Sequence, residues 1–189
     1  MKKSFVFSGS GGQGIMSAGI TLAHTAIDMG KHATYLPEYG PEQRGGSAKC
    51  TVVVDDDFIV SPLPRMCDNL IVMNEQAYKK FVWDVKSGGI LLLNSSRVKL
   101  PVEVDGEVID RDDVTYICAP VDDIALEIGN AKIANIILLG ILIGATGIVS
   151  RDTLAVSLEE KFRDKKPGVL EMNLKALDRG IEIGLEYKK

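Results

Sequence analysis

The sequence is poor in cysteine, in aromatic residues and in positive charge. It has three cysteines in 189 residues, and none of them stands in the CxxC spacing that many metal and redox sites use. This count excludes a disulfide-stabilised secreted scaffold, and we expect Cys50, Cys67 and Cys118 to be reduced, buried thiols. The 26 acidic residues outnumber the 22 lysines and arginines. The chain therefore lacks the basic surface that a nucleic-acid-binding protein needs.

Long hydrophobic runs are also missing. The longest, residues 133–149, falls short of the ~20 residues that a membrane-spanning helix needs, and Asn135 and three glycines interrupt it. Because a helix that is apolar on every side is buried on every side, this segment either crosses the centre of the domain or packs against another chain. The apolar stretch at residues 4–8 is too short for the core of a secretory signal peptide. We therefore predict a cytoplasmic protein without a membrane segment.

Strand and helix patterns alternate along the sequence. Residues 3–8 are rich in Phe and Val and precede a glycine cluster, which predicts a strand and a tight turn. Apolar residues then recur every three or four positions from Ile15 to Met29, and Gly30 follows as a helix-ending residue. Further strands are expected at 33–36, ending before Pro37, and at 70–73, 90–93 and 114–118, with further helices at 76–85, 121–128, 132–146, 151–162 and 169–187.

This alternation predicts one α/β domain over residues 1–189, with a Rossmann-like, doubly wound and mainly parallel sheet and a helical C-terminal third. Two turns predict a small antiparallel insert. Asp55–Asp57 separate the runs 50–54 and 58–60, which is typical of a hairpin, and Asp105-Gly106 separates 101–104 from 107–109.

The first candidate site is the glycine cluster Gly9-x-Gly11-Gly12-Gln13-Gly14, between a predicted strand and a predicted helix. This is the context of the dinucleotide-binding fingerprint, in which glycines let the backbone approach a phosphate at a helix N-terminus. However, the acidic residue expected at the end of the second strand is absent, because Pro37 stands there and Glu38 falls in the following loop. Three interpretations remain open: a turn that packs closely, an anion or phosphate site, and an NAD or FAD site.

The second candidate site is the loop 37–47, which combines two prolines and three glycines with Glu38, Glu42 and Arg44. Arginine offers a planar fork that matches a carboxylate or a phosphate. Ligands of doubly wound sheets collect at the carboxyl ends of the strands, so we expect this loop and the glycine cluster to share one rim. In the alternative interpretation, Arg44 pairs with Glu38 or Glu42 and only maintains the shape of the loop.

The segment SGSGGQGI at 8–15, followed by YGPEQRGG at 39–46, resembles the gamma subunit of the 2-oxoacid:ferredoxin oxidoreductases. The resemblance continues at 68–72 and 135–147 and so covers nearly the whole chain. Among these enzymes, the YGPExRGG form looks closest to the 2-oxoglutarate type.

This resemblance implies an accessory subunit that does not catalyse alone. Such complexes convert a 2-oxoacid, coenzyme A and oxidised ferredoxin into acyl-CoA, carbon dioxide and reduced ferredoxin, with thiamine diphosphate, Mg²⁺ and iron–sulfur clusters in other subunits. This chain has no CxxCxxC run for a cluster and no GDG…NN thiamine motif, so we expect it to bind no cofactor by itself. The implied partners are alpha and beta subunits, a ferredoxin-like delta subunit, and ferredoxin through the complex.

The expected site has no catalytic residue and no metal ligand. It is a rim that meets coenzyme A, an anionic substrate or the catalytic subunit. The rim residues are Gly9, Gly11, Gly12, Gln13, Gly14, Tyr39, Gly40, Pro41, Glu42, Arg44, Gly45 and Gly46. We also expect an isolated subunit to expose an apolar patch and to self-associate through it.

Other polar residues are expected to be structural. Asp55–Asp57 would form a solvated hairpin tip, and Asp110, Asp112 and Asp113 around Arg111 a charged surface loop. One functional alternative stays open: a stand-alone NAD(P)- or nucleotide-binding oxidoreductase that uses the turn Gly9–Gly14.

Overall fold

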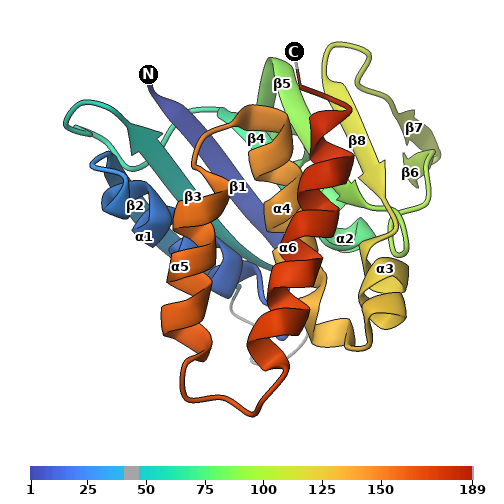
Figure 1. Ribbon diagram of the computed structural model, residues 1–189. Coiled ribbons are helices and arrows are strands. Elements are labelled where there is room, and N and C mark those ends of the chain that lie inside the picture. The colour runs from blue at the N-terminus through green and yellow to red at the C-terminus, as the bar shows by residue number, and fades with distance from the viewer. Residues whose placement is uncertain (41–46, 189) are drawn as a thin grey trace.

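The computed structural model describes residues 1–40 and 47–188 and has a six-stranded sheet in the order β2-β3-β1-β4-β5-β8 (Figure 1). β1, β4, β5 and β8 are parallel, whereas β3 is antiparallel to both of its neighbours, β1 and β2. The strands are β1 (Lys3–Ser10), β2 (His32–Tyr39), β3 (Ser47–Asp55), β4 (Cys67–Val72), β5 (Val85–Asn94) and β8 (Thr115–Ala119). The predicted α/β class with a mostly parallel sheet is confirmed.

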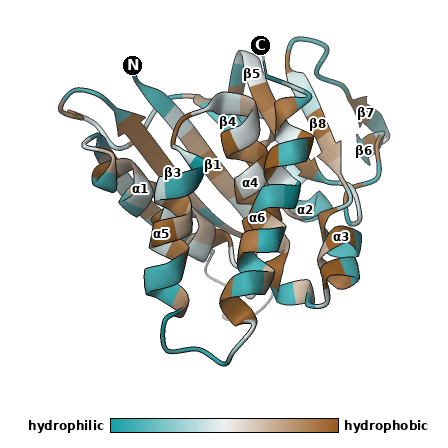
Figure 2. Ribbon diagram, viewed as in Figure 1, coloured by the Kyte–Doolittle hydropathy of each residue, from teal (hydrophilic) through white to brown (hydrophobic). Residues whose placement is uncertain are grey.

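Helices cover both faces of the sheet. One face carries α1 (Ile15–Asp28), α3 (Val121–Ile128), α4 (Ala134–Thr146), α5 (Arg151–Phe162) and α6 (Val169–Leu185), and the other carries α2 (Glu75–Phe81) (Figure 1). Short 3₁₀ turns follow α2 at Val82–Asp84 and precede α4 at Ala131–Ile133. The start of α5 is fixed by Ser150, whose side chain accepts a hydrogen bond from Thr153 N. In Figure 2, α5 and α6 carry hydrophilic residues beside hydrophobic ones, as outer helices do.

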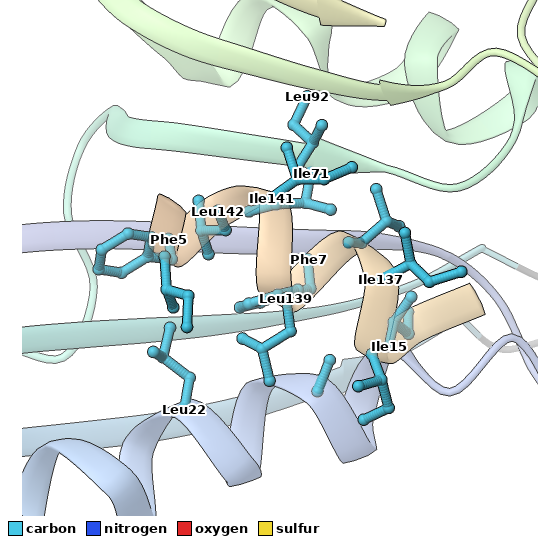
Figure 3. Packing of buried hydrophobic residues seen from close by; sticks show 14 of the residues in the cluster. Phe5, Phe7, Ile15, Leu22, Ile71, Leu92, Ile137, Leu139, Ile141 and Leu142 are labelled. Carbon is cyan, nitrogen blue, oxygen red and sulfur yellow. The ribbon is translucent and has the colours of Figure 1, made fainter. Parts of the chain in front are cut away.

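Helix α4 occupies the centre of the domain. Every residue from Ala134 to Ala145 is buried, between the sheet and α6. α4 and α6 approach so closely that a Cβ at Gly144 would lie 2.6 Å from Ile181 O. Of the two alternatives that the sequence left open for this segment, burial inside the chain is therefore the correct one. Figure 3 shows the residues of this core, among them Phe5, Phe7, Ile15, Leu22, Ile71, Leu92, Ile137, Leu139, Ile141 and Leu142.

The second strand is longer than predicted. It does not end at Leu36 but continues through Pro37 to Tyr39, with Pro37 opposite Cys50 of β3. β2 is an outer strand of the described sheet and pairs with β3, so a residue without an N–H is tolerated there. Glu38 consequently belongs to the strand and pairs with Lys49, 3.4 Å away.

The predicted hairpin at 50–60 is wrong. Residues 50–54 lie in β3, which pairs with β1 and β2, and residues 58–60 form no strand. Asp56 instead accepts hydrogen bonds from the Met1 amine and from Lys31. The small antiparallel insert is the other predicted hairpin, in which Asp105 and Gly106 connect β6 (Val102–Val104) and β7 (Glu107–Ile109).

The helix predicted at 76–85 is also too long. α2 ends at Phe81, and β5 begins at Val85 and includes the pair Gly88-Gly89. Gly89 is required for close packing there, because a Cβ would lie 2.7 Å from Asp68 O. The helix pattern failed here because the turn Val82–Asp84 continues the helical periodicity.

Two predictions about single side chains are wrong. Cys118 is exposed, because it lies on the outer strand β8, whereas Cys50 and Cys67 are buried as expected. Arg111 is not part of a charged surface loop: its side chain is buried and donates to Val82 O, Val85 O and the Asp113 carboxylate. The sequence shows the charges around Arg111 but not the two backbone carbonyls.

Candidate functional site

The two candidate loops lie at the same edge of the sheet. β2 and β1 run in the same direction, since β3 between them is antiparallel to both, so their carboxyl ends share the lower edge in Figure 1. Ser10 is opposite Ser47 in the register of β1 and β3, and Gly40 N donates to Ser47 O at 3.0 Å. The structure thus brings the glycine loop Gly9–Gly14 and the pair Tyr39-Gly40 to one rim.

Part of the second candidate loop cannot be placed on this rim. Pro41, Glu42, Arg44, Gly45 and Gly46 lie outside the described residues. Tyr39 is 73% exposed at the end of β2, so its ring is available to a ligand or a neighbouring subunit.

The glycines of the first loop serve different purposes. Gly9 and Gly14 are close to other side chains: a Cβ at Gly9 would lie 2.9 Å from Met73 Cβ, and one at Gly14 would lie 2.8 Å from Asn135 Nδ2. Gly12 and Gly14 also have φ values of 89° and 75°, which L side chains rarely adopt. By contrast, among residues 1–40 and 47–188, no atom beyond the chain neighbours lies within 4 Å of a Cβ built on Gly11 or Gly12. Close packing therefore explains why glycine is needed at both ends of the loop, but it does not explain the glycines in the middle of the loop.

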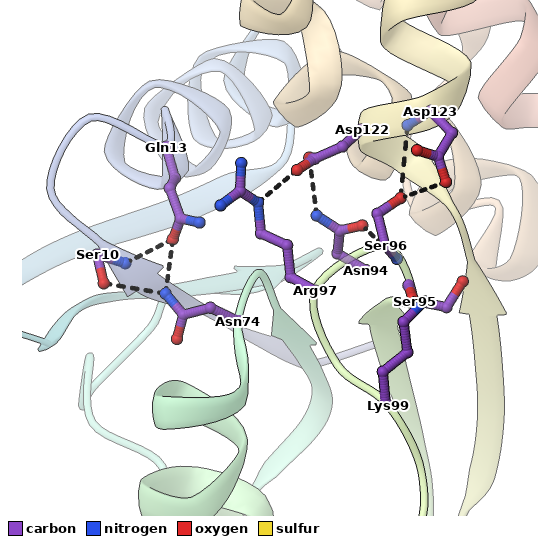
Figure 4. Close-up of polar contacts among 10 residues, drawn as sticks. All are labelled: Ser10, Gln13, Asn74, Asn94, Ser95, Ser96, Arg97, Lys99, Asp122 and Asp123. Carbon is purple, nitrogen blue, oxygen red and sulfur yellow. Dashed lines mark hydrogen bonds and ion pairs between the residues drawn. The ribbon is translucent and has the colours of Figure 1, made fainter.

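Three side chains hold the glycine loop in shape. Gln13 Oε1 accepts hydrogen bonds from Ser10 N (2.7 Å) and from Asn74 Nδ2 (2.8 Å) (Figure 4). Asn74 Nδ2 also donates to Ser10 Oγ, while Asn74 Oδ1 accepts from Ala77 N and caps α2. From the other side, Asn135 of α4 donates to Gly14 O at 3.2 Å. Elements distant in sequence therefore fix this loop.

A second polar group lies beside it at the ends of β5 and β8. Asp122, in the first turn of α3, accepts from Asn94 Nδ2 at 2.9 Å and from Arg97 Nε (Figure 4). Asn94 is fully buried and accepts from Ser96 N at 3.2 Å, so it holds the Asp122 carboxylate from inside the protein. Asp122 in turn holds the guanidinium of Arg97 next to the glycine loop.

Between these two groups is a hollow of about 360 Å³. Its lining residues are Gly12, Gln13, Gly14, Met73, Arg97, Asp122, Ala131, Lys132 and Ala134. Two cationic side chains, Arg97 and Lys132, face one carboxylate, Asp122, whose two oxygens already accept hydrogen bonds. The hollow is therefore suited to an anionic group.

Sequence reasoning missed Asn74, Arg97, Asp122 and Lys132. Asn74 and Arg97 each follow a predicted strand, and Asp122 opens the helix after another. The rule that ligands collect at the carboxyl ends of strands would have selected these three residues. Lys132 lies just before α4 and does not follow a predicted strand, so this rule would not have selected it.

The topology argues against a dinucleotide site. In the dinucleotide-binding fold the second strand lies next to the first, and the acidic residue at its end reaches the ribose. Here β3 separates β1 from β2, and Glu38 pairs with Lys49. Within residues 1–40 and 47–188, no three His, Cys, Asp or Glu side chains are grouped as a metal site would require. In the same residues, no helix has the length and hydropathy needed to cross a membrane.

Comparison with known proteins identifies relatives over almost the whole chain. Residues 4–183 match the family model described as pyruvate ferredoxin/flavodoxin oxidoreductase. The 2-oxoglutarate synthase subunit KorC of Methanocaldococcus jannaschii is 38% identical over 192 residues, which cover 98% of this chain and 96% of KorC. The ketoisovalerate oxidoreductase subunit VorA of Methanothermobacter marburgensis is 34% identical over 182 residues, covering 93% of this chain. The match spans 35% of VorA, so this chain corresponds to about a third of that protein.

A solved structure agrees with these matches. The gamma subunit of a keto/oxoacid ferredoxin oxidoreductase from Geobacter sulfurreducens superimposes with a TM-score of 0.82 at 32% identity. The superposition covers 100% of this chain and 99% of that subunit. The resemblance that the two glycine-bearing motifs predicted is confirmed.

Proposed function

Because the chain belongs to the pyruvate ferredoxin/flavodoxin oxidoreductase family, we propose that it is the gamma subunit of a 2-oxoacid:ferredoxin oxidoreductase. In that complex it contributes to the oxidative decarboxylation of a 2-oxoacid with coenzyme A, which yields acyl-CoA, carbon dioxide and reduced ferredoxin. One observation carries the proposal: the solved gamma subunit from Geobacter sulfurreducens matches this chain from end to end. The whole-chain match to KorC supports it.

The proposed 2-oxoacid is 2-oxoglutarate. The motif YGPEQRGG at 39–46 favours this substrate, and KorC, named for 2-oxoglutarate, matches over 96% of its length. Ketoisovalerate is the competing substrate, because VorA is similar at nearly the same identity. Ferredoxin reduction by the assembled complex with each 2-oxoacid in turn distinguishes the two.

The proposed cofactors belong to the partner subunits. An iron–sulfur cluster needs several thiolates that converge on one point. The Cys50 and Cys67 side chains lie in separate core clusters on opposite faces of the sheet, and burial raises the pKa of each thiol to about 12. These cysteines do not fit a cluster, so we assign the clusters, thiamine diphosphate and Mg²⁺ to the other chains of the complex.

The proposed role of this chain is to close the entrance of the active site with its carboxyl-edge rim. The hollow beside the glycine loop offers Arg97 and Lys132 to an anion, and coenzyme A and 2-oxoacids are both anionic. The rim can also bind carboxylates of the catalytic subunit. This role needs the neighbouring subunit, because an open hollow at the edge of one domain cannot enclose a substrate.

Purification through an affinity tag on this chain tests the proposed function. We expect a thiamine-diphosphate-binding chain and a ferredoxin-like chain to co-purify, and the complex to reduce ferredoxin with a 2-oxoacid and coenzyme A. The isolated chain should show no thermal shift with NAD(H), NADP(H) or FAD, whereas a true ligand at 100 times its Kd would stabilise it by about 2.7 kcal/mol. Absence of partner chains, or a clear shift with a dinucleotide, would contradict the proposal.

An Arg44→Ala substitution tests the second candidate loop. If Arg44 binds an anion of the substrate or of the catalytic subunit, its loss removes a charge-assisted hydrogen bond worth about 1.5–3 kcal/mol. We therefore expect at least a tenfold rise in the KM for coenzyme A or the 2-oxoacid, or a comparable weakening of assembly. Unchanged kinetics and assembly would favour the alternative interpretation, in which Arg44 only shapes its own loop.

A further inference from the structure

Two backbone N–H groups determine the orientation of the side-chain amides beside the glycine loop. A backbone N–H can only donate, so the Gln13 atom 2.7 Å from Ser10 N must be the amide oxygen. For the same reason, the Asn74 atom 2.9 Å from Ala77 N is an oxygen. Asn74 must then present its NH₂ group to Gln13 Oε1, as the 2.8 Å contact requires. Neither amide can be turned over without the loss of a backbone hydrogen bond.

The NH₂ group of Gln13 can therefore donate hydrogen bonds into the hollow. It has no hydrogen-bond partner within residues 1–40 and 47–188, and Figure 4 shows it on the side of the amide that faces Arg97. Arg97 uses Nε for Asp122, which leaves its two terminal NH₂ groups without a partner among the described residues. Lys132 adds a third side chain that can only donate.

We propose that Asn74 is a positioning residue. Through Gln13 it leaves the hollow with side-chain groups that have no partner among the described residues and are all donors, beside an Asp122 carboxylate that is already hydrogen-bonded. This donor site suits an anionic group that can only accept. Asn74 does not touch the ligand in this proposal. It holds the oxygen of Gln13 against Ser10 N, so that the amide NH₂ is aimed at the ligand. The inference rests on the proposed function, which supplies the anion.

The expected ligand group is a phosphate of coenzyme A. Its oxygens accept several hydrogen bonds at once, and its charge matches Arg97 and Lys132, whose positive charges exceed the one carboxylate of the hollow. A carboxylate of the 2-oxoacid shares this chemistry. The KM values of the two substrates, measured separately, distinguish them.

An Asn74→Asp substitution separates positioning from helix capping. Aspartate caps a helix as well as asparagine does, so α2 and the stability of the chain should be preserved. However, a carboxylate oxygen would replace the NH₂ group and face Gln13 Oε1, which favours rotation of the Gln13 amide and places its oxygen in the hollow. Loss of one donor to a charged group corresponds to about a tenfold loss of affinity or more.

We therefore expect the assembled Asn74→Asp complex to show a KM for coenzyme A raised about tenfold, with kcat changed less than twofold. A Gln13→Glu substitution should act in the same way, because it keeps the oxygen that Ser10 N needs and replaces the free NH₂ group by an anionic oxygen. Ser150→Asp is the matched control: it alters the cap of α5, away from the glycine loop, and should change neither KM.

The outcomes are distinct. A rise in the KM for coenzyme A supports the proposal, and a rise for the 2-oxoacid alone supports the donor site with the carboxylate as its ligand. If Asn74→Asp and Gln13→Glu leave both KM values unchanged in a folded complex, the proposal is overturned and Asn74 is only a cap.

One measurement does not depend on the complex. Sodium pyrophosphate added to the isolated full chain should shift the NMR resonances of the Gln13 side-chain amide and of Arg97 Nε, and Gln13→Glu should abolish the Arg97 shift. Absence of shifts in the unmodified chain would overturn the inference. If the chain joins no oxidoreductase, the proposed function fails, whereas the pyrophosphate titration still decides whether the donor site exists.

Discussion

A Gly180→Val substitution is expected to lower the free energy of unfolding by more than about 4 kcal/mol, because it forces apart two helices whose backbones touch. A Cβ at Gly180 would overlap Ile137 O and lie 2.9 Å from Gly140 Cα. These are backbone atoms of the buried helix α4, so no side-chain rotation can relieve the overlap. Such a loss is comparable with the whole stability of a typical domain, roughly 5–15 kcal/mol.

Urea unfolding of the isolated chain, followed by circular dichroism, measures this effect. Gly180→Ala should lower the free energy of unfolding by less than Gly180→Val does, since the gain of about 1 kcal/mol in helix propensity partly offsets the overlap. Gly11→Val is the matched control, because in the part of the chain that the structure describes no atom beyond the chain neighbours lies within 4 Å of a Cβ at Gly11, and its φ is not positive. An unchanged urea midpoint for Gly180→Val would mean that α4 and α6 do not pack as the structure describes.

An Arg111→Met substitution should destabilise the chain by about 3 kcal/mol, because it removes the donors of several buried hydrogen bonds while nearly keeping the volume. Arg111 is 6% exposed, and its terminal nitrogens donate to Val82 O at 2.9 Å and to Val85 O at 3.0 Å. Both carbonyls would lose these donors, and the two hydrogen bonds are buried. The Asp113 carboxylate would lose its partner as well.

The pH dependence of the stability difference between the unmodified chain and Arg111→Met measures the contribution of the ion pair between Arg111 and Asp113. The hydrogen bond from Arg111 holds the pKa of Asp113 below its ordinary value. The ion pair therefore stabilises the folded chain fully above the ordinary aspartate pKa of about 3.9. This contribution is lost as the pH falls through the lower pKa that Asp113 has in the folded chain. Arg179→Met, which breaks an exposed pair with Glu182, is the control and should cost less than about 1 kcal/mol. An equally small effect for both variants would contradict the structural role of Arg111.

Local sequence patterns predicted elements whose limits are set by neighbouring residues. The helices at 151–162 and 121–128 were both predicted with their observed limits. The strand, glycine loop and helix of residues 3–28 were likewise predicted from their composition. In each case the deciding interactions lie within a few residues along the chain.

Other features depended on which strands become neighbours. Pro37 looks like the end of a strand in the sequence but is tolerated in β2 because β2 is an outer strand. Residues 50–54 pair with β1 and β2 instead of forming a local hairpin. Arg111 finds its carbonyl partners more than 20 residues away, at Val82 and Val85.

The candidate site shows the same division. The sequence by itself determined the glycine loop, its position between a strand and a helix, and the family that these motifs indicate. Only the tertiary structure decided which side chains surround the Gln13 amide, because Asn74 is 61 residues away and Arg97 reaches the hollow from the end of another strand. Backbone turns are encoded locally by glycine, whereas the polarity of a binding surface depends on hydrogen-bond partners that folding brings together.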